Sequence, residues 1–175
     1  MILKLARTPG IYLVGFMGCG KTTVGRLLAD RLGWNFVDLD AEIEAVQKMP
    51  IAEIFDQIGE KHFRKLETEA IRQHVHMIQS GRPTVIALGG GAFAQPGNFE
   101  LLEHNGVSLW LDCPLSVMRQ RVEADASRPL ARDPQKFEEL FQARRSSYAR
   151  ADFRIEVAGD LPESVIEAIL RVPIF

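Results

Sequence analysis

Apolar and polar residues along the chain follow two patterns that predict different elements. Short apolar runs typical of buried strands lie near residues 11–14, 35–38, 84–88, 107–111 and 153–157. Apolar residues at helical spacing predict helices at about 21–32, 41–47, 60–79, 98–105, 114–123 and 135–149, with a last helix from Pro162. Strands that alternate with helices are typical of a parallel sheet covered on both faces. The pattern therefore predicts an α/β fold.

Two breaks divide the region between the second and third predicted strands. Pro50 and Gly59 split residues 41–79 into shorter helices, and Gly81-Arg82-Pro83 ends the long one. The chain has 175 residues, of which 46% are hydrophobic, and it contains no internal repeat. This length suits one domain with a substantial core, so we predict a single domain over residues 1–175.

Charge and cysteine content exclude several classes of protein. The net charge of −2 gives no electrostatic reason to expect binding to nucleic acid or to an anionic membrane. No run of 18 apolar residues occurs, and the first residues are too few and too interrupted for a signal peptide, so a cytoplasmic protein is expected. The two cysteines, Cys19 and Cys113, lack metal-ligand spacing and predict neither a zinc site nor a disulfide framework.

Residues 15–22 fill the pattern G-x-x-x-x-G-K-[ST] between a predicted strand and a predicted helix. Glycines at 15, 18 and 20 allow backbone N–H groups to turn toward a phosphate at the positive end of the helix. Lys21 is then expected to reach the β- and γ-phosphates, and the Thr22 hydroxyl to bind Mg²⁺. The segment thus predicts binding of a nucleotide polyphosphate, whereas the alternative is a glycine-rich turn beside an exposed lysine.

Asp38-Leu39-Asp40 follows the second predicted strand. If the chain is still extended there, both carboxylates share a face and point into the crevice beside the phosphate loop, one for magnesium and one for a substrate hydroxyl. The alternative is that Asp40 caps a helix that starts at Ala41, with Asp38 at a solvated strand end.

Two further features have both a functional and an ordinary interpretation. Arg64 and Glu67 share a helix face at i,i+3, either as part of a site or as a surface ion pair. Gly89-Gly90-Gly91 follows a predicted buried strand, where three glycines let a ligand approach backbone N–H groups. A plain flexible turn is the alternative there.

Eight arginines lie between residues 119 and 154. The polar, proline-containing segment 124–134 within this region suits a mobile lid that brings a cation to a transferring phosphoryl group, or else a solvated loop. Arg144 and Tyr148 lie one helical turn apart and are either site residues or a helix-surface pair.

Together these residues resemble the shikimate kinases, small relatives of the nucleoside monophosphate kinases. Asp38-Leu39-Asp40 resembles the family's D-x-D motif, Phe63-Arg64-x-x-Glu67 its F-R-x-x-E motif, Gly89-Gly90-Gly91 its triple glycine, and Arg128-Pro129-Leu130 the R-P-L of its lid. Arg144 and Tyr148 fill its R-x-P-x-Y pattern, except that Ser146 replaces the usual proline, which puts only the local helix-end geometry in doubt.

The resemblance implies a fold and an activity. The fold is a three-layer α/β/α P-loop kinase fold with a five-stranded parallel sheet in the order 2-3-1-4-5. Substrate-binding helices at about 39–79 and a lid at about 124–135 flank the core. The implied activity is transfer of the ATP γ-phosphoryl group to the 3-hydroxyl of shikimate, with Mg²⁺ as cofactor, on the route to chorismate and the aromatic amino acids.

The resemblance also implies the site residues. Those that bind ATP are Gly18, Cys19, Gly20, Lys21, Thr22, Thr23, Arg121 and Arg128, with Arg121 on the adenine near loop 158–162. Those that bind shikimate are Asp40, Arg64, Gly89, Gly90, Gly91 and Arg144, with Glu67 holding Arg64 in place. The implied catalytic residues are Lys21, Asp38 and Arg128, and the implied magnesium ligands are Thr22 and Asp38.

Some alternatives stay open at this level. Asp38 either takes the proton of the hydroxyl or acts through magnesium, and we favour magnesium because a loose phosphoryl-transfer transition state needs little base assistance. A kinase for gluconate or for nucleoside monophosphates is one rival, and a P-loop module that binds nucleotide without transfer is another. Cys19 supplies a backbone N–H and, as a further hypothesis, a thiol that nucleotide protects. We expect a monomer with ATP, ADP and shikimate as its partners.

Overall fold

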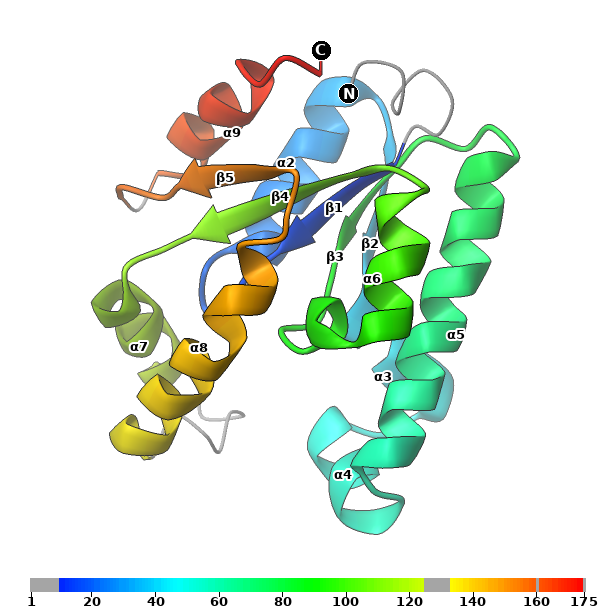
Figure 1. Cartoon of the computed structure of the whole chain (residues 1–175), viewed down its shortest axis with the longest axis vertical. Helices are drawn as coiled ribbons and strands as arrows, with labels where there is room; N and C mark the ends of the chain where they lie inside the picture. Colours follow the sequence, from blue (N-terminus) through cyan, green and yellow to red (C-terminus); the bar gives the residue numbers. More distant parts are fainter. Residues whose placement is uncertain (1–9, 125–132, 160, 175) are drawn as a thin grey trace.

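The structure is a computed structural model that describes residues 10–124, 133–159 and 161–174. Its sheet contains the strands β1 (Gly10–Val14), β2 (Asn35–Asp38), β3 (Thr84–Ala87), β4 (Val107–Asp112) and β5 (Phe153–Glu156). All neighbouring strands are parallel, and their order is β2-β3-β1-β4-β5 (Figure 1). The predicted α/β class and strand order are therefore confirmed.

The helices connect these strands. They are α2 (Lys21–Leu32), α3 (Leu39–Gln47), α4 (Ile51–Gln57), α5 (Glu60–Gln79), α6 (Pro96–Glu103), α7 (Leu115–Glu123), α8 (Pro134–Tyr148) and α9 (Pro162–Leu170), with the 3-10 turn η1 (Ala92–Ala94). The bounds of α2 and α5 are those predicted from the sequence. The helix α6 begins two residues earlier than predicted because Pro96, whose fixed φ suits the first turn, starts it.

The helices cover both faces of the sheet, so the fold has three layers (Figure 1). On one face α2 packs against α9 and against β1, β2 and β3. On the other face α5 packs against α6, and α6 against β4. The central strand β1 is buried along its whole length, which explains its uniformly apolar sequence after Gly10.

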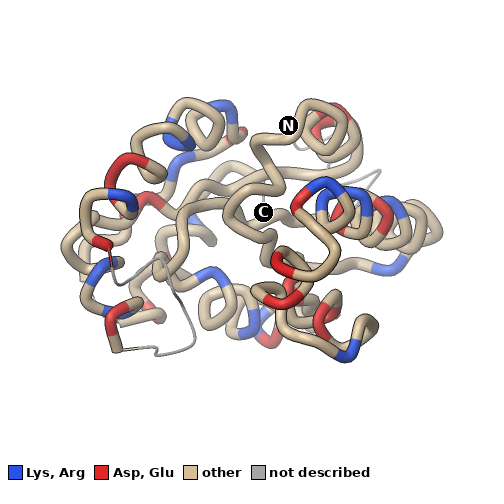
Figure 2. The backbone as a smooth tube through the Cα atoms, turned by 90° about the horizontal axis from the view of Figure 1, so that it is seen from below, with Lys and Arg blue, Asp and Glu red and all other residues tan. Residues whose placement is uncertain are grey.

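Charged residues lie mainly on the helices at the surface. Lys, Arg, Asp and Glu are interspersed along the helices visible in Figure 2, in keeping with the net charge of −2. None of the described helices is both long and apolar enough to span a membrane.

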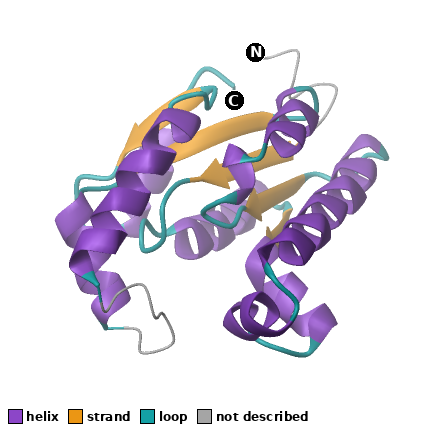
Figure 3. Ribbon diagram, turned by 60° about the horizontal axis from the view of Figure 1, so that its bottom comes forward, coloured by secondary structure: helices purple, strands orange, loops and turns teal. Residues whose placement is uncertain are grey.

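Aromatic packing fixes helix α8 against the loop that follows β1. The ring of Phe16 meets Phe137 and Phe141 edge to face, with ring centroids 5.0 and 5.4 Å apart. Beyond the carboxyl ends of the strands, α8 and α7 form one group of helices, and α3, α4 and the start of α5 form another (Figure 3). Ligands of open parallel sheets bind at this edge.

Candidate active site

The loop between β1 and α2 has the backbone that its glycines predict. Gly15, Gly18 and Gly20 have φ values of 146°, 82° and 96°. A Cβ atom at Gly18 would lie 2.8 Å from the carbonyl oxygen of Met118, so a side chain there is excluded by strain and by space. No side chain caps α2, which leaves the N–H groups of its first turn available to an anion.

Lys21 folds over this loop. Its Nζ donates to the carbonyl oxygens of Gly15 at 2.8 Å and of Phe16 at 3.1 Å, and it lies 3.7 Å from Sγ of Cys19. The ammonium group is thus held at the centre of the phosphate loop. Cys19 is itself part of the loop, and its thiol is buried.

Thr22 and Asp38 meet beside the loop. Thr22 Oγ1 donates to Asp38 Oδ2 at 2.5 Å, while Asp38 Oδ1 accepts from the backbone N–H of Ala41 at 3.1 Å. A hydroxyl and a carboxylate side by side at an exposed edge are the hard oxygen donors that Mg²⁺ prefers. The two residues therefore fit a magnesium ion at this position.

Asp38, and not Asp40, caps the following helix. The extended conformation ends at Asp38, and α3 begins at Leu39, so the alternative in which Asp40 caps a helix from Ala41 is wrong. The premise that the chain is extended through Asp40 is also wrong, because Asp40 lies in the first turn of α3. Asp40 nevertheless faces the glycine turn, since a Cβ at Gly89 would lie 2.5 Å from its Oδ1.

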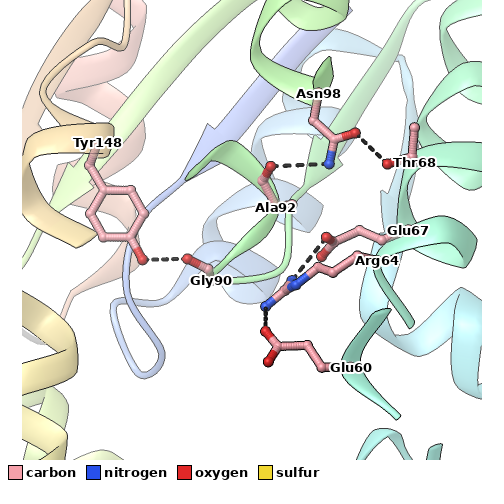
Figure 4. A network of polar contacts seen from close by, with 8 residues as sticks. All are labelled: Glu60, Arg64, Glu67, Thr68, Gly90, Ala92, Asn98 and Tyr148. Carbon is pink, nitrogen blue, oxygen red and sulfur yellow. Dashed lines mark hydrogen bonds and ion pairs between the residues drawn. The ribbon is translucent and has the colours of Figure 1, made fainter. Parts of the chain in front are cut away.

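Arg64 is half-buried and its partner Glu67 is fully buried, which excludes the interpretation as a surface ion pair. Arg64 Nη1 lies 2.9 Å from Glu67 Oε2, and Nη2 lies 3.3 Å from Glu60 Oε1 (Figure 4). The side chain of Glu67 is 0% exposed, whereas that of Glu60 is largely exposed. A Cβ at Gly91 would lie 2.6 Å from Arg64 Nη2, so the guanidinium is packed tightly against the glycine turn.

Burial raises the pKa of Glu67 from 4.5 to about 7. The charge and hydrogen bond of Arg64 oppose this shift, while the charge of Asp40 adds to it. The carboxyl group thus titrates near neutral pH at the point where α5 meets the glycine turn.

Arg144 and Tyr148 reach the same turn from α8. Tyr148 is fully buried, and its hydroxyl donates to the carbonyl oxygen of Gly90 at 2.5 Å (Figure 4). A Cβ at Gly90 would lie 3.2 Å from Arg144 Nη1. Burial raises the pKa of Tyr148, so its hydroxyl stays protonated and remains a donor. With Ser146 in place of proline, α8 continues unbroken to Tyr148.

Arg121 lies on the other side of the phosphate loop. Its Nη1 donates to the carbonyl oxygen of Gly18 at 3.0 Å. A cavity of about 230 Å³ beside it is lined among others by Gly20, Thr23, Gly159 and Pro162. Of the residues predicted to border the adenine, Arg121, Gly159 and Pro162 therefore line one pocket next to the phosphate loop.

Part of the predicted lid lies outside the described residues, and Arg128 is in that part. At the described end of the lid range 124–135, the helix predicted over 135–149 begins at Pro134. Asp133 caps α8 by accepting from the N–H of Lys136 at 3.1 Å, and residues 134 and 135 already belong to the helix.

Asn98 is among the buried polar residues that sequence reasoning missed. It is 0% exposed and hydrogen-bonded to Thr68 and to the backbone of Ala92. A signal was present, because Asn98 precedes Leu101 and Leu102 by three and four residues and so shares their core-facing side of α6.

Comparison with known proteins identifies the family. The model of the shikimate kinase family matches residues 17–173. A shikimate kinase from Thermosynechococcus vestitus is 46% identical over 165 residues, which cover 92% of this chain and 87% of that protein. One from Persephonella marina is 42% identical over 161 residues, with 91% of this chain and 96% of that protein covered. The chain belongs to the shikimate kinase family.

A solved structure of a shikimate kinase agrees with this assignment. The enzyme from Acinetobacter baumannii, determined in complex with shikimate, superimposes with a TM-score of 0.87 at 36% identity and covers 99% of this chain and 97% of that one. The resemblance to the shikimate kinases drawn from the motifs is therefore confirmed. The range matched by the shikimate kinase model includes the predicted site residues from Gly18 to Arg144.

Proposed function

We propose that this protein transfers the γ-phosphoryl group of ATP to the 3-hydroxyl of shikimate, giving shikimate 3-phosphate and ADP. Beyond family membership, the position of the glycine turn supports this proposal. The turn at Gly90 lies between the phosphate loop and the arginine of α8: a Cβ at Gly90 would be 3.9 Å from the carbonyl oxygen of Gly15 and 3.2 Å from Arg144 Nη1. A phosphate donor and an anionic acceptor thus have adjoining sites.

On the donor side, the loop amides from Gly18 to Thr23 and the ammonium group of Lys21 bind the phosphates. Arg121 packs beside the adenine in the neighbouring pocket. By its position in the family's lid motif, Arg128 supplies a cation that stabilises the charge of the transition state.

On the acceptor side, Arg64 and Arg144 bind the carboxylate of shikimate through planar pairs of N–H donors, which lysines would not provide. Asp40 accepts from the ring hydroxyls, and the amides of Gly89, Gly90 and Gly91 donate to the substrate. Glu67 fixes the orientation of Arg64 through the 2.9 Å contact.

Thr22 and Asp38 are the residues that would hold Mg²⁺, since their oxygens lie side by side at the phosphate loop. When bound, the ion neutralises charge on the β- and γ-phosphates. We assign Asp38 to this role and not to that of a general base. A cytoplasmic location and a monomeric state remain predictions.

The first test is a coupled ADP-release assay with ATP, Mg²⁺ and shikimate, run alongside quinate, gluconate and nucleoside monophosphates. We expect shikimate-dependent release above about 1 s⁻¹, the usual range of kinases. Phosphorus NMR of the product then identifies the phosphorylated hydroxyl. If only another acceptor is phosphorylated, that acceptor and not shikimate is the substrate. Normal ATP binding without transfer to any acceptor would favour a nucleotide-binding module.

A further inference from the structure

A chain of two hydrogen bonds joins three elements behind the acceptor site. Thr68 Oγ1 on α5 lies 2.7 Å from Asn98 Oδ1 on α6, and Asn98 Nδ2 donates at 3.1 Å to the carbonyl oxygen of Ala92 in η1 (Figure 4). The side chain of Asn98 is 0% exposed and its bond to Ala92 is buried, so water does not compete for that bond, while the bond to Thr68 is partly buried. We call the pair Thr68 and Asn98 the amide relay.

The relay permits one orientation of the amide group. The carbonyl of Ala92 can only accept, so it requires the NH₂ group of Asn98, which turns the amide oxygen toward Thr68. A flipped amide would set two buried oxygens against each other, and a buried unpaired polar group is costly. The Thr68 hydroxyl must therefore donate, and its proton holds the amide in place.

The two ends of the relay belong to the two parts of the acceptor site. Thr68 follows Glu67 and lies one helical turn beyond Arg64 on α5. Ala92 follows Gly91, and its N–H donates to the carbonyl oxygen of Gly89 at 3.1 Å, which closes the glycine turn. Arg64 and Gly91 are in such close contact that a Cβ at Gly91 would be 2.6 Å from Nη2, so a small shift between helix and turn changes the position of the guanidinium.

We infer that Thr68 and Asn98 are positioning residues of the acceptor site, which set the distance between Arg64 and the glycine turn. The inference rests on the proposed function. Tyr148 holds the turn from the opposite side through the carbonyl of Gly90. Neither relay residue is placed to touch substrate, so the effect of its loss passes through Arg64 and the turn amides.

The chain contains a matched control for this inference. Gln79 Nε2, on the last residue of α5, donates to Asn105 Oδ1 at 2.6 Å, and Asn105 Nδ2 donates to the carbonyl oxygen of Leu101 on α6 at 2.7 Å. This second pair joins α5 to α6 through the same kinds of hydrogen bond, with Asn105 buried just beyond α6 and Gln79 exposed at the end of α5. Gln79 is eleven residues beyond Thr68, about 16 Å along the helix and away from the site.

The experiment compares Thr68→Val, Thr68→Ser, Asn98→Asp and Gln79→Met in the shikimate-dependent ADP-release assay and in thermal unfolding. Thr68→Val keeps the shape of the side chain and removes the donor, and we expect the KM for shikimate to rise about 5- to 10-fold with the KM for ATP unchanged. Asn98→Asp removes the donor to Ala92 and is expected to raise the KM for shikimate at least as much.

Thr68→Ser keeps the hydroxyl donor that Thr68→Val removes, so its KM for shikimate should stay within about 2-fold of the wild-type value. Gln79→Met should lower the unfolding midpoint without changing this KM. If Thr68→Val and Gln79→Met both lower stability and leave the KM for shikimate unchanged, the relay is structural only and the inference is wrong. A wild-type protein without shikimate turnover would instead refute the proposed function, and the inference with it.

Discussion

The phosphate loop and the acceptor side of the site differ in how the chain builds them. The phosphate loop is one contiguous segment, residues 15–22, and it presents backbone groups and Lys21 from a single turn. The acceptor side collects side chains from three helices around the turn at 89–91, including the fully buried Glu67. Local backbone geometry therefore specifies the phosphate loop, whereas tertiary packing specifies the acceptor site.

This difference implies that substitutions on the two sides have different kinetic signatures. Loss of a donor-side group should lower kcat, because those groups act on the transferring phosphoryl group. Loss of an acceptor-side group should mainly raise the KM for shikimate, and some acceptor-side losses should also change stability. Substitutions at Asp38, Arg64, Glu67 and Tyr148 test this contrast, from the largest expected effect to the smallest.

Asp38→Asn should have the largest effect, a fall in kcat of about 10²- to 10³-fold with a modest change in the KM for shikimate. Asparagine keeps an oxygen that can accept from the N–H of Ala41, so the cap of α3 is retained while the charge is lost. Steady-state kinetics with magnesium and ATP varied independently measure the effect. A large rise in the KM for shikimate at unchanged kcat would place Asp38 on the acceptor side instead.

Arg64→Ala should raise the KM for shikimate by about 10- to 100-fold, because a charge-assisted pair of hydrogen bonds to the carboxylate is removed. Arg144→Ala should act in the same direction. Arg72→Ala is the matched control, since Arg72 forms an i,i+3 pair with Glu69 on the same helix, at 3.7 Å and with both side chains exposed. An unchanged KM in both site variants would exclude the proposed carboxylate-binding role.

Glu67→Gln should change the pH dependence of stability. Since the folded-state pKa of Glu67 is raised from 4.5 to about 7, the folded protein keeps a proton that the unfolded chain has lost between these pH values. The contribution of Glu67 to the free energy of unfolding therefore falls as pH rises through this window, by on the order of 3 kcal/mol.

In Glu67→Gln this pH dependence of the free energy of unfolding should disappear. The difference in free energy of unfolding between the variant and the wild type should therefore change between pH 4.5 and 7. Denaturant titrations at several pH values measure it, with Glu69→Gln as a control at an exposed position of the same helix. Parallel stability curves for Glu67→Gln and wild type would show that the carboxyl group titrates as it does in the unfolded chain.

Tyr148→Phe should have the smallest effect, a rise of about 3- to 5-fold in the KM for shikimate, because one hydrogen bond between neutral groups is lost from the glycine turn. Tyr12→Phe is its control. Tyr12 is equally buried and donates to the carbonyl oxygen of Asn105 at 2.7 Å, at the opposite end of the sheet. Both variants should lose stability, but only Tyr148→Phe should weaken shikimate binding.

Much of the fold follows from the sequence, because its cues are local. Apolar runs define the strands, and helices α2 and α5 begin and end at glycines or beside polar residues that the sequence displays. The predicted start of α3, residue 41, was two residues too late, because two aspartates can occupy the capping position. Only the hydrogen bond between Asp38 and the N–H of Ala41 decides between them.

The contacts of the acceptor site were less predictable. The i,i+3 spacing of Arg64 and Glu67 indicates that they meet, but their burial depends on the packing of α5 against the glycine turn. The 3-10 turn η1 and the bond from Asn98 to Ala92 arise only where α6 folds back on that turn. Interactions between residues 30 positions apart, such as Thr68 and Asn98, leave no periodic signal in the sequence.

The position of β1 at the centre of the sheet has a consequence for synthesis of the chain. Its partners are β3 and β4, with Ile11 paired to Val85 and to Val107, so β1 is synthesised before both of the strands that pair with it. At translation rates of roughly 5–20 residues per second, the apolar strand stays unpaired on both edges for several seconds. Such long-range pairing slows folding, and an apolar strand with unpaired edges is prone to aggregation until β3 and β4 have been made.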